Sequence, residues 1–247
     1  MKLDARGSDM VQSKCADDKE ISGIIIIDKP QGMTSHDIVD FMRKRFSIKK
    51  AGHAGTLDPM ATGVLVILLG KTTKKSGELI NDDKEYEGIL TLGVKTDTGD
   101  KCGKVICEKT VSPLEKNLIE KVFNEFQGQM KQVPPAFCAL KHKGRPLYKF
   151  AREGIEVKKE PRDIVVKELV ILKYDFPDVH FRVWCSKGTY VRKLCQDIGD
   201  RLECGAHLSG LRRMRSGVFS IEKALPLNFF KNIKKEELSL HLYEQKF

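Results

Sequence analysis

The sequence predicts one domain that combines β-strands with amphipathic α-helices. Two apolar runs rich in β-branched residues, 23–28 and 64–69, have the length and composition of buried strands. Apolar residues recur with helical spacing in 34–46, 114–126 and 189–202. With 247 residues, of which 40% are hydrophobic and 32% charged, the chain is long enough and apolar enough to bury a core.

The remaining elements follow from the same two patterns, taken along the chain. Thr34 or Ser35 can cap the first helix, and the alternation at 84–93 predicts a strand with Tyr86 and Leu90 on one face. The other expected elements are a short helix at 74–80 and strands at 103–108, 164–174, 179–186 and 205–215. Residues 1–20 mix charges without periodicity, so we expect a disordered or loosely attached extension there.

The positive charge of the chain indicates a polyanionic partner. The net charge is +10, which suits nucleic acid better than an anionic membrane surface. No stretch approaches the roughly 20 apolar residues of a membrane span, and the first residues lack the apolar core of a signal peptide. The seven cysteines show no metal-ligand spacing, so we expect reduced, packed thiols in a cytoplasmic protein and no metal site.

A polar loop at 51–63 runs into the second buried strand and carries His53 and Asp58. Pro59 confines Asp58 to extended backbone and removes the next N–H, which fixes the direction of the carboxylate. From local sequence alone, Asp58 is more often a turn residue than a catalytic one. Arg192 lies in the first turn of the helix at 189–202, where a cation opposes the helix dipole, so we expect it to have an anionic partner.

Basic residues also gather in three other segments. The segment 134–159 interleaves lysines and arginines with Phe137, Tyr148 and Phe150, a texture that suits an RNA-facing surface. From composition alone, this segment could equally be an ordinary loop with a short amphipathic helix. The ends at 43–50 and 212–215 are either phosphate-contacting rims or solvated surface.

Six stretches together resemble the bacterial tRNA pseudouridine-55 synthase family, commonly called TruB. They are DKPQGMTSHD at 28–37, GHAGTLDPMATGVL at 52–65, KEYEG at 84–88, PPAFCALKHKGRPLYKFAREG at 134–154, GTYVRKLCQDIG at 188–199 and CGAHLSGLRRMRSG at 204–217. The resemblance implies an α+β, pseudouridine-synthase-like fold: a mixed, mostly antiparallel sheet flanked by helices, with a central RNA-binding cleft. It also implies an isomerase for tRNA modification. Uridine 55 of the tRNA T loop is flipped out, its N1–C1′ bond is broken, and the uracil is rejoined through C5 without cofactor or metal.

The resemblance also implies a role for each matching residue. Asp58 is the expected nucleophile, Arg192 its ion-pair partner and Tyr86 the ring that stacks on the flipped uracil. His53 is expected to fill the space that the uridine leaves in the T loop. The remaining matches are Tyr190 and Leu211 as pocket walls and Lys29 as a brace for the loop. From periodicity alone, Tyr86 is a core tyrosine and His53 an ordinary loop histidine.

The family pattern sets further expectations for domains and partners. Residues 21–221 match the catalytic domain and 134–159 an RNA-gripping insertion, whereas the tail at 222–247 is too short for a complete C-terminal RNA-binding domain of the PUA type. We therefore expect the insertion and the basic ends at 43–50 and 212–215 to carry more of the RNA contact. The expected partner is the T stem-loop of tRNA, bound by a monomer without a membrane or an obligate protein partner. Two alternatives are a noncatalytic tRNA-binding or folding protein and a pseudouridine synthase for another RNA.

Overall fold

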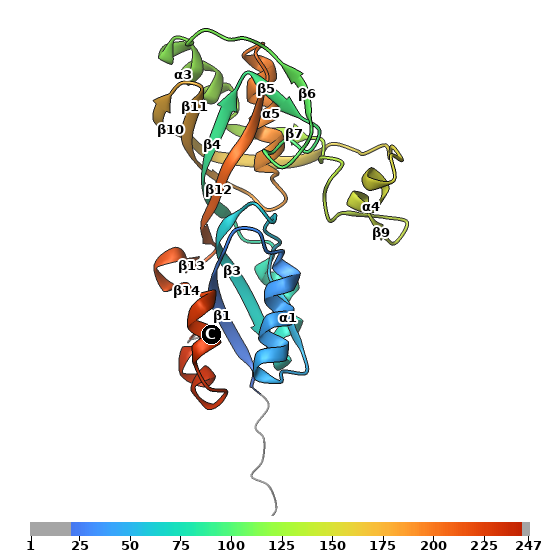
Figure 1. The fold of residues 1–247 in the computed structure, drawn as a ribbon, viewed down its shortest axis with the longest axis vertical. Coiled ribbons are helices and arrows are strands. Elements are labelled where there is room, and N and C mark those ends of the chain that lie inside the picture. Colours follow the sequence, from blue (N-terminus) through green and yellow to red (C-terminus); the bar gives the residue numbers. More distant parts are fainter. Residues whose placement is uncertain (1–20, 244–247) are drawn as a thin grey trace, which may run out of the picture.

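The computed structural model describes residues 21–243. The predicted N-terminal extension, residues 1–20, lies outside this range. The molecule is elongated, with one lobe above the other (Figure 1). None of the helices described is both long and apolar enough to cross a membrane.

The described residues form strands, α-helices and short 3-10 helices. The strands are β1 Gly23–Lys29, β2 Ala51–His53, β3 Thr62–Leu69, β4 Lys84–Leu92, β5 Val94–Thr96, β6 Val105–Glu108, β7 Gly128–Gln132, β8 Lys141–His142, β9 Arg145–Pro146, β10 Arg162–Asp175, β11 Asp178–Cys185, β12 Ala206–Ser216, β13 Phe219–Ser220 and β14 Leu225–Pro226. The α-helices are α1 Ser35–Phe46, α2 Ser76–Leu79, α3 Lys116–Glu125, α4 Leu147–Arg152, α5 Val191–Arg201 and α6 Leu227–Asn232. The 3-10 helices are η1 Gly70–Lys75, η2 Ile221–Lys223 and η3 Glu236–His241.

One large sheet runs through both lobes in the order β14-β1-β3-β12-β4-β11-β10-β7, with β2 on β3 and β13 on β12. The pairs β1–β14 and β3–β12 are parallel, and the other pairs of this sheet are antiparallel. This mixed, mostly antiparallel sheet with helices packed on it confirms the predicted fold class.

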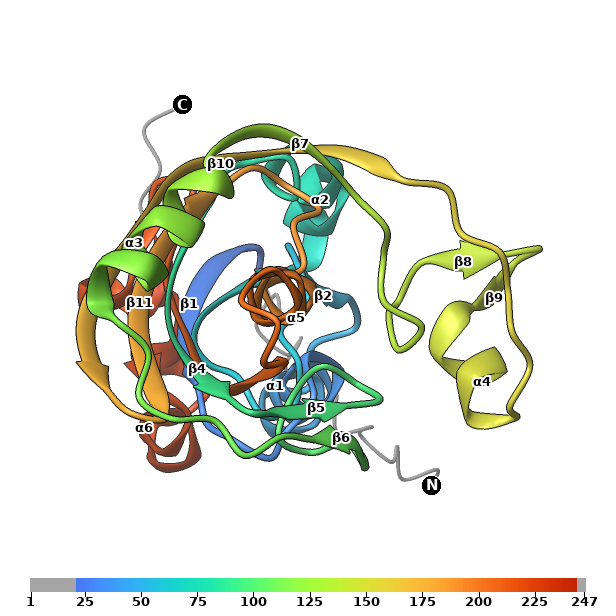
Figure 2. The ribbon, with the colours of Figure 1, turned by 90° about the horizontal axis from the view of Figure 1, so that it is seen from above.

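The two lobes bury their helices by the apolar faces that the sequence predicted. In the upper lobe the strands curve around α5 (Figure 2), and α5 buries Val191, Leu194, Cys195 and Ile198. In the lower lobe α1 begins with a capping box: the Thr34 side chain accepts from the Asp37 N–H, and the Asp37 carboxylate accepts from the Thr34 N–H. Both helices pack into one core that runs the length of the sheet.

The lobes meet where β12 pairs with β3. The register there contains two pairs, Arg212 with Thr62 and Arg213 with Gly63. Gly63 has φ +99°, and a Cβ on it would lie 2.2 Å from the Arg213 carbonyl oxygen, so no other residue fits. The loop that carries Asp58 ends at this junction.

Several elements differ from the sequence predictions. The helix expected at 74–80 is present but shorter, as α2 Ser76–Leu79, and the 3-10 helix η1 Gly70–Lys75 precedes it. The loop expected at 51–63 begins with the short strand β2. The strand β7 and the β8–β9 hairpin were not predicted, because runs of two to five residues are too short for a pattern to identify.

Candidate active site

The loop between β2 and β3 holds Asp58 between fixed neighbours. The Ser35 hydroxyl, at the start of α1, accepts from the Leu57 N–H at 2.8 Å and donates to the Leu57 carbonyl at 3.1 Å. On the other side, the Gly32 N–H donates to the Pro59 carbonyl at 2.8 Å. Both residues beside Asp58 are thus tied to the first strand-turn-helix, which leaves the carboxylate as the free part of the loop.

Lys29 braces the same loop from below. Its side chain is fully buried, and its Nζ donates to the carbonyls of Pro30, Met33 and Pro59 at 2.8, 2.7 and 3.4 Å. Burial lowers the pKa of this amine to about 8, although the nearby Asp58 carboxylate acts in the opposite direction. These contacts agree with the bracing role expected for Lys29.

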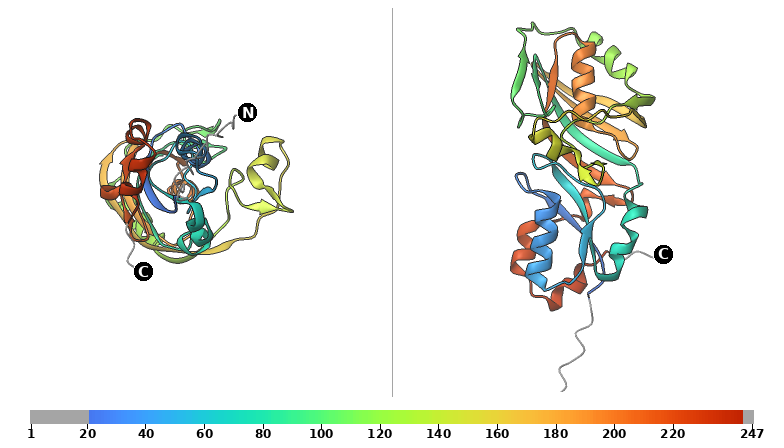
Figure 3. Two further views of the ribbon diagram at one scale, coloured as in Figure 1. Left: turned by 90° about the horizontal axis from the view of Figure 1, so that it is seen from below. Right: turned by 90° about the vertical axis from the view of Figure 1, so that its right-hand side faces the viewer.

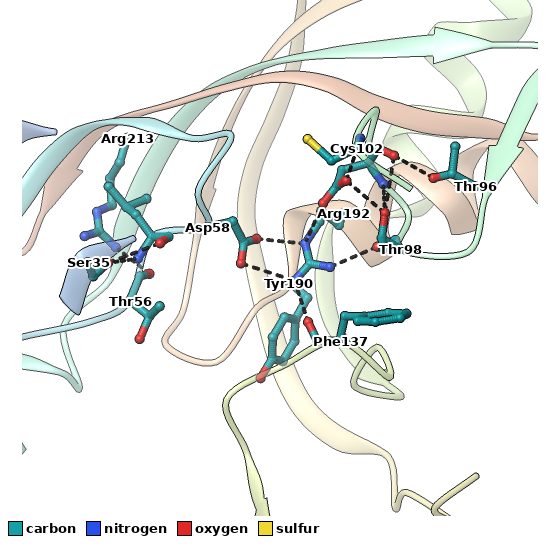
Figure 4. A network of polar contacts seen from close by, with 12 residues as sticks. Ser35, Thr56, Asp58, Thr96, Thr98, Cys102, Phe137, Tyr190, Arg192 and Arg213 are labelled. Atoms are coloured by element: carbon teal, nitrogen blue, oxygen red, sulfur yellow. Dashed lines mark hydrogen bonds and ion pairs between the residues drawn. The ribbon is translucent and has the colours of Figure 1, made fainter. Parts of the chain in front are cut away.

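Arg192 reaches Asp58 from α5 in the other lobe (Figure 4). Its Nε lies 2.7 Å from Asp58 Oδ2, and its Nη2 lies 3.3 Å from Oδ1. The remaining donors are directed at backbone: Nη1 donates to the Thr98 carbonyl and Nη2 to the Phe137 carbonyl, both at 2.9 Å. The Arg192 side chain is 5% exposed and that of Asp58 36%, so a buried cation presents a carboxylate that a ligand can reach.

A second carboxylate, Asp100, supports the same guanidinium. Its Oδ2 lies 3.6 Å from Arg192 Nε, and its side chain is 9% exposed. Its Oδ1 accepts from the Thr98 hydroxyl at 2.8 Å and from the Cys102 N–H at 2.9 Å. Arg192 therefore lies between two carboxylates. Asp100 could not be identified from the sequence, because it has the appearance of an ordinary turn residue.

A cavity of about 300 Å³ opens beside this ion pair. Its lining includes Asp58, Tyr86, Tyr190, Arg192 and Leu211, the residues expected to form the pocket. They come from the loop, β4, the start of α5 and β12, so the fold brings together positions up to 153 residues apart. The volume is at the lower end of that of small-molecule pockets, about 300–1,000 Å³.

Tyr190 is held in the wall by a residue that sequence reasoning missed. Its N–H donates to Gln132 Oε1 at 2.8 Å, and Gln132 Nε2 donates back to the Tyr190 carbonyl at 3.2 Å. Gln132 is buried at the end of β7, directly before the insertion. Burial raises the pKa of the Tyr190 phenol and that of the Tyr86 phenol, so both rings are neutral at pH 7.

Arg213 was also missed, because the sequence suggested a basic strand end facing RNA. Its side chain is 1% exposed. Nε donates to the Val64 carbonyl at 2.7 Å, Nη2 to the Gly55 carbonyl at 3.2 Å and Nη1 to the Thr56 carbonyl at 3.4 Å. The expectation that 212–215 contacts RNA is therefore wrong for Arg213.

Arg212 and Arg215, in the same segment, also contact carboxylates of the protein. Arg212 binds Asp28 through Nη2 at 2.7 Å and Nη1 at 3.1 Å. Arg215 Nε lies 3.6 Å from Glu85 Oε2. This basic strand end is thus largely neutralised within the protein.

His53 lies at the end of β2, directly before the Asp58 loop, and does not line the cavity. Burial, and then the positive charge of Arg213, lower the pKa of His53 below its usual value of 6.5. The neutral imidazole therefore predominates at pH 7 and offers a flat, uncharged ring at the entrance of the loop.

The insertion at 134–159, which carries β8, β9 and α4, stands apart from the body (Figure 2). Cys138, Ala139 and Leu140 form part of the cavity wall. The Arg145 guanidinium lies 4.8 Å from the centre of the Phe150 ring, and Lys141, Lys143 and Lys149 of the same segment are exposed. The insertion thus contributes both a wall of the site and a basic surface next to it.

The basic segment at 43–50 lies elsewhere. Ser35, the first residue of α1, contacts the Asp58 loop. The segment begins eight residues later, toward the other end of α1, a helix about 18 Å long. The Lys50 carbonyl accepts from the Gly70 N–H, and Arg45 donates to the Ile233 carbonyl. The right-hand view of Figure 3 shows α1, in blue, running along the lower lobe beside the C-terminal segment, in red. The segment therefore lies away from Asp58, and RNA contact by 43–50 stays a prediction.

The chain matches proteins whose names describe one activity. The family model "TruB family pseudouridylate synthase (N terminal domain)" matches residues 43–191, and "tRNA pseudouridylate synthase B C-terminal domain" matches 192–242. Proteins named tRNA pseudouridine synthase B are similar to it: that of Geotalea uraniireducens is 49% identical over 84% of this chain and 67% of its own length. That of Opitutus terrae is 43% identical over 91% of this chain and 93% of its own length.

Solved structures show the same fold. A chain of a Cbf5-Nop10-Gar1 complex is 32% identical with a TM-score of 0.69, over 90% of this chain and 59% of that one. A chain of an H/ACA RNP bound to a substrate RNA containing 2'-deoxyuridine is 32% identical with a TM-score of 0.64, over 83% of this chain and 51% of that one. The present chain thus spans only about half to three fifths of these two chains.

Proposed function

The chain belongs to the TruB family of pseudouridylate synthases, and we propose that it converts uridine 55 in the T loop of tRNA to pseudouridine, with Asp58 as the nucleophile. The observation that carries this proposal is the carboxylate of Asp58, fixed by Arg192 at a cavity of about 300 Å³. Relatives that cover most of both chains carry the name tRNA pseudouridine synthase B, which supports tRNA as the substrate.

The cavity suits a base that has left the RNA stack. A base inside folded RNA is out of reach of an enzyme, so the uridine must be flipped out. The Tyr86 ring in the wall provides a face for the uracil, and such stacking stabilises a bound base by about 1–3 kcal/mol. We propose that His53, neutral at pH 7 and outside the cavity, stacks in the T loop where the uridine was.

The chemistry needs an ionised carboxylate and no net oxidation or reduction. Substrate and product contain the same atoms, because the C1′–N1 and C5–H bonds are exchanged for C1′–C5 and N1–H bonds. Arg192 binds the Asp58 carboxylate through two charge-assisted hydrogen bonds. It also fixes the direction from which the carboxylate meets the flipped nucleotide.

RNA contact falls to the insertion, whose lysines are exposed beside the cavity. Amines there can neutralise phosphates of the T stem-loop. The six described cysteines carry free thiols, which supports a reducing, cytoplasmic environment. We also propose that the chain works as a monomer without an obligate protein partner.

The test is incubation with a T stem-loop transcript followed by chemical mapping of pseudouridine. We expect one modified position, uridine 55, and none when cytidine replaces it. Asp58→Asn should abolish the product but leave RNA binding within about threefold of the parent, because the amide keeps the shape of the carboxylate. The matched control is Asp175→Asn, whose exposed side chain pairs with Lys173 far along the chain from the site.

Each alternative has its own outcome. RNA binding without product from the parent protein would favour a noncatalytic tRNA-binding protein. Product on another RNA but not on tRNA would favour a synthase with a different substrate. Full activity of Asp58→Asn would remove Asp58 from the role of nucleophile.

A further inference from the structure

Arg213 connects the two ends of the loop that carries Asp58. Gly55 and Thr56 precede Asp58 in the loop, and Val64 follows it at the start of β3. The guanidinium donates to the carbonyls of all three, at 3.2, 3.4 and 2.7 Å. One side chain from β12 therefore closes the loop at its base.

This guanidinium is a buried cation held by neutral groups. It is 1% exposed, and among residues 21–243 it forms no ion pair with an aspartate or glutamate. Burying a charge without a counter-ion is unfavourable unless its hydrogen bonds are satisfied. A strand position that needed only stability would be filled better by an apolar side chain, so the arginine points to a requirement of the loop.

The backbone of Arg213 lies at the junction of the two lobes. It pairs with Gly63 in the two-residue register between β12 and β3, where a Cβ on Gly63 would lie 2.2 Å from the Arg213 carbonyl oxygen. Arg213 thus fixes the loop at the place where the Asp58 lobe meets the Arg192 lobe. The distance between Asp58 and Arg192 depends on how the two lobes are joined at this pairing of β12 with β3.

We infer that Arg213 is a positioning residue, which clamps the Asp58 loop across the lobe junction and so holds Asp58 in register with Arg192. The inference rests on the proposed function, because the consequence is a rate of pseudouridine formation. The loop is held from two sides. Ser35 and Lys29, in the lower lobe, bind the carbonyls of Leu57 and Pro59. Arg213 alone among these three comes from the strand that joins the lobes.

The clamp predicts a loss of rate without a loss of RNA affinity. Arg213→Lys keeps the charge but has one donor group in place of a fork, so it cannot reach all three carbonyls. A displacement of about 1 Å at a reacting group can cost about 100-fold in rate. We therefore expect the single-turnover rate on a T stem-loop to fall about 100-fold, while the Kd for the RNA stays within about threefold.

A readout of the loop itself separates a clamp from a general role in folding. Hydrogen exchange in Arg213→Lys should rise in peptides that cover residues 54–63 and stay unchanged in α3 and α5. Arg213→Gln, which retains one donor group without the charge, should show the same pattern and a lower rate than Arg213→Lys. The matched control is Arg201→Lys, the same substitution at an exposed ion pair with Glu125, and we expect it to retain the parent rate.

The outcomes are distinct. A parent protein that makes no pseudouridine would reject the proposed function and not the clamp geometry. An active parent with Arg213→Lys within threefold of its rate would overturn the clamp. The clamp would also be overturned if Arg213→Lys lowered both the rate and the RNA affinity and raised hydrogen exchange across both lobes. Arg213 would then only support folding.

Discussion

Arg192 and Asp58 lie 134 residues apart in the chain and meet through two contacts, Nε to Oδ2 at 2.7 Å and Nη2 to Oδ1 at 3.3 Å. The arginine belongs to the upper lobe and the aspartate to the lower lobe. Their pairing is the point at which the two halves of the fold become one site.

Replacement of Arg192 should lower the rate of pseudouridine formation even when the positive charge is kept. Arg192→Lys keeps a cation but loses the planar fork that binds Asp58 and two backbone carbonyls at once. We expect the rate of pseudouridine formation to fall about 100-fold or more. Arg192→Met should in addition lower the free energy of unfolding by about 3 kcal/mol, because the buried Asp100 loses its cation.

Single-turnover kinetics and denaturant unfolding measure these two effects separately. Arg182→Lys, at a partly exposed position on β11, serves as the control and should change neither. An Arg192→Lys enzyme as fast as the parent would mean that the fork is not needed.

The family resemblance located most of the site, and local signals supported two of its residues. Asp58 precedes a proline in a polar loop, and Arg192 opposes a helix dipole, which led to the expectation of an anionic partner. The resemblance supplied Tyr86, Tyr190 and Leu211, and the fold places all three around the same cavity.

The supporting residues could not be found in this way. Arg213 lies in a run of basic residues, and which of them points inward depends on the pairing of β12 with β4, including a register shift between Arg213 and Arg215. Asp100 and Gln132 belong to a turn and a short strand end with no distinctive pattern. Each acquires its role only through contacts with residues more than 50 positions away.

Tyr86 should matter through its ring. Tyr86→Leu removes the face on which uracil would stack and should reduce kcat/KM by about 5- to 150-fold, the equivalent of about 1–3 kcal/mol. Tyr86→Phe keeps the ring and should lose less. The measurement is the rate at subsaturating T stem-loop for both variants, with circular dichroism to confirm folding. If Phe and Leu variants were equally slow, stacking would not be the main contribution.

Lys29 should give the fold a measurable pH dependence. Its pKa falls from 10.5 to about 8 on folding, so between pH 8 and 10.5 the unfolded chain binds more protons than the folded one. Stability from this group therefore rises with pH across that window. The drop from 10.5 to about 8 corresponds to about 3 kcal/mol at most.

The comparison with Lys29→Met isolates this contribution from other titrating groups. The difference in unfolding free energy, parent minus variant, should increase from pH 7 to pH 10, as measured by urea unfolding. A difference that stays constant over that range would show that Lys29 keeps its ordinary pKa in the folded protein.

The insertion should dominate the salt dependence of RNA binding. Lys141, Lys143 and Lys149 are exposed on it, and each phosphate contact contributes about 0.7–0.9 to the slope of log affinity against log salt. Replacing all three with alanine should make that slope less steep by about 2–3 and weaken binding at low salt. The control replaces Lys44, Lys49 and Lys50, which are equally exposed but lie at the far end of the lower lobe. Equal effects from both triple variants would mean that the RNA reaches the far end of the lobe as well, and that the insertion is only part of a longer binding surface.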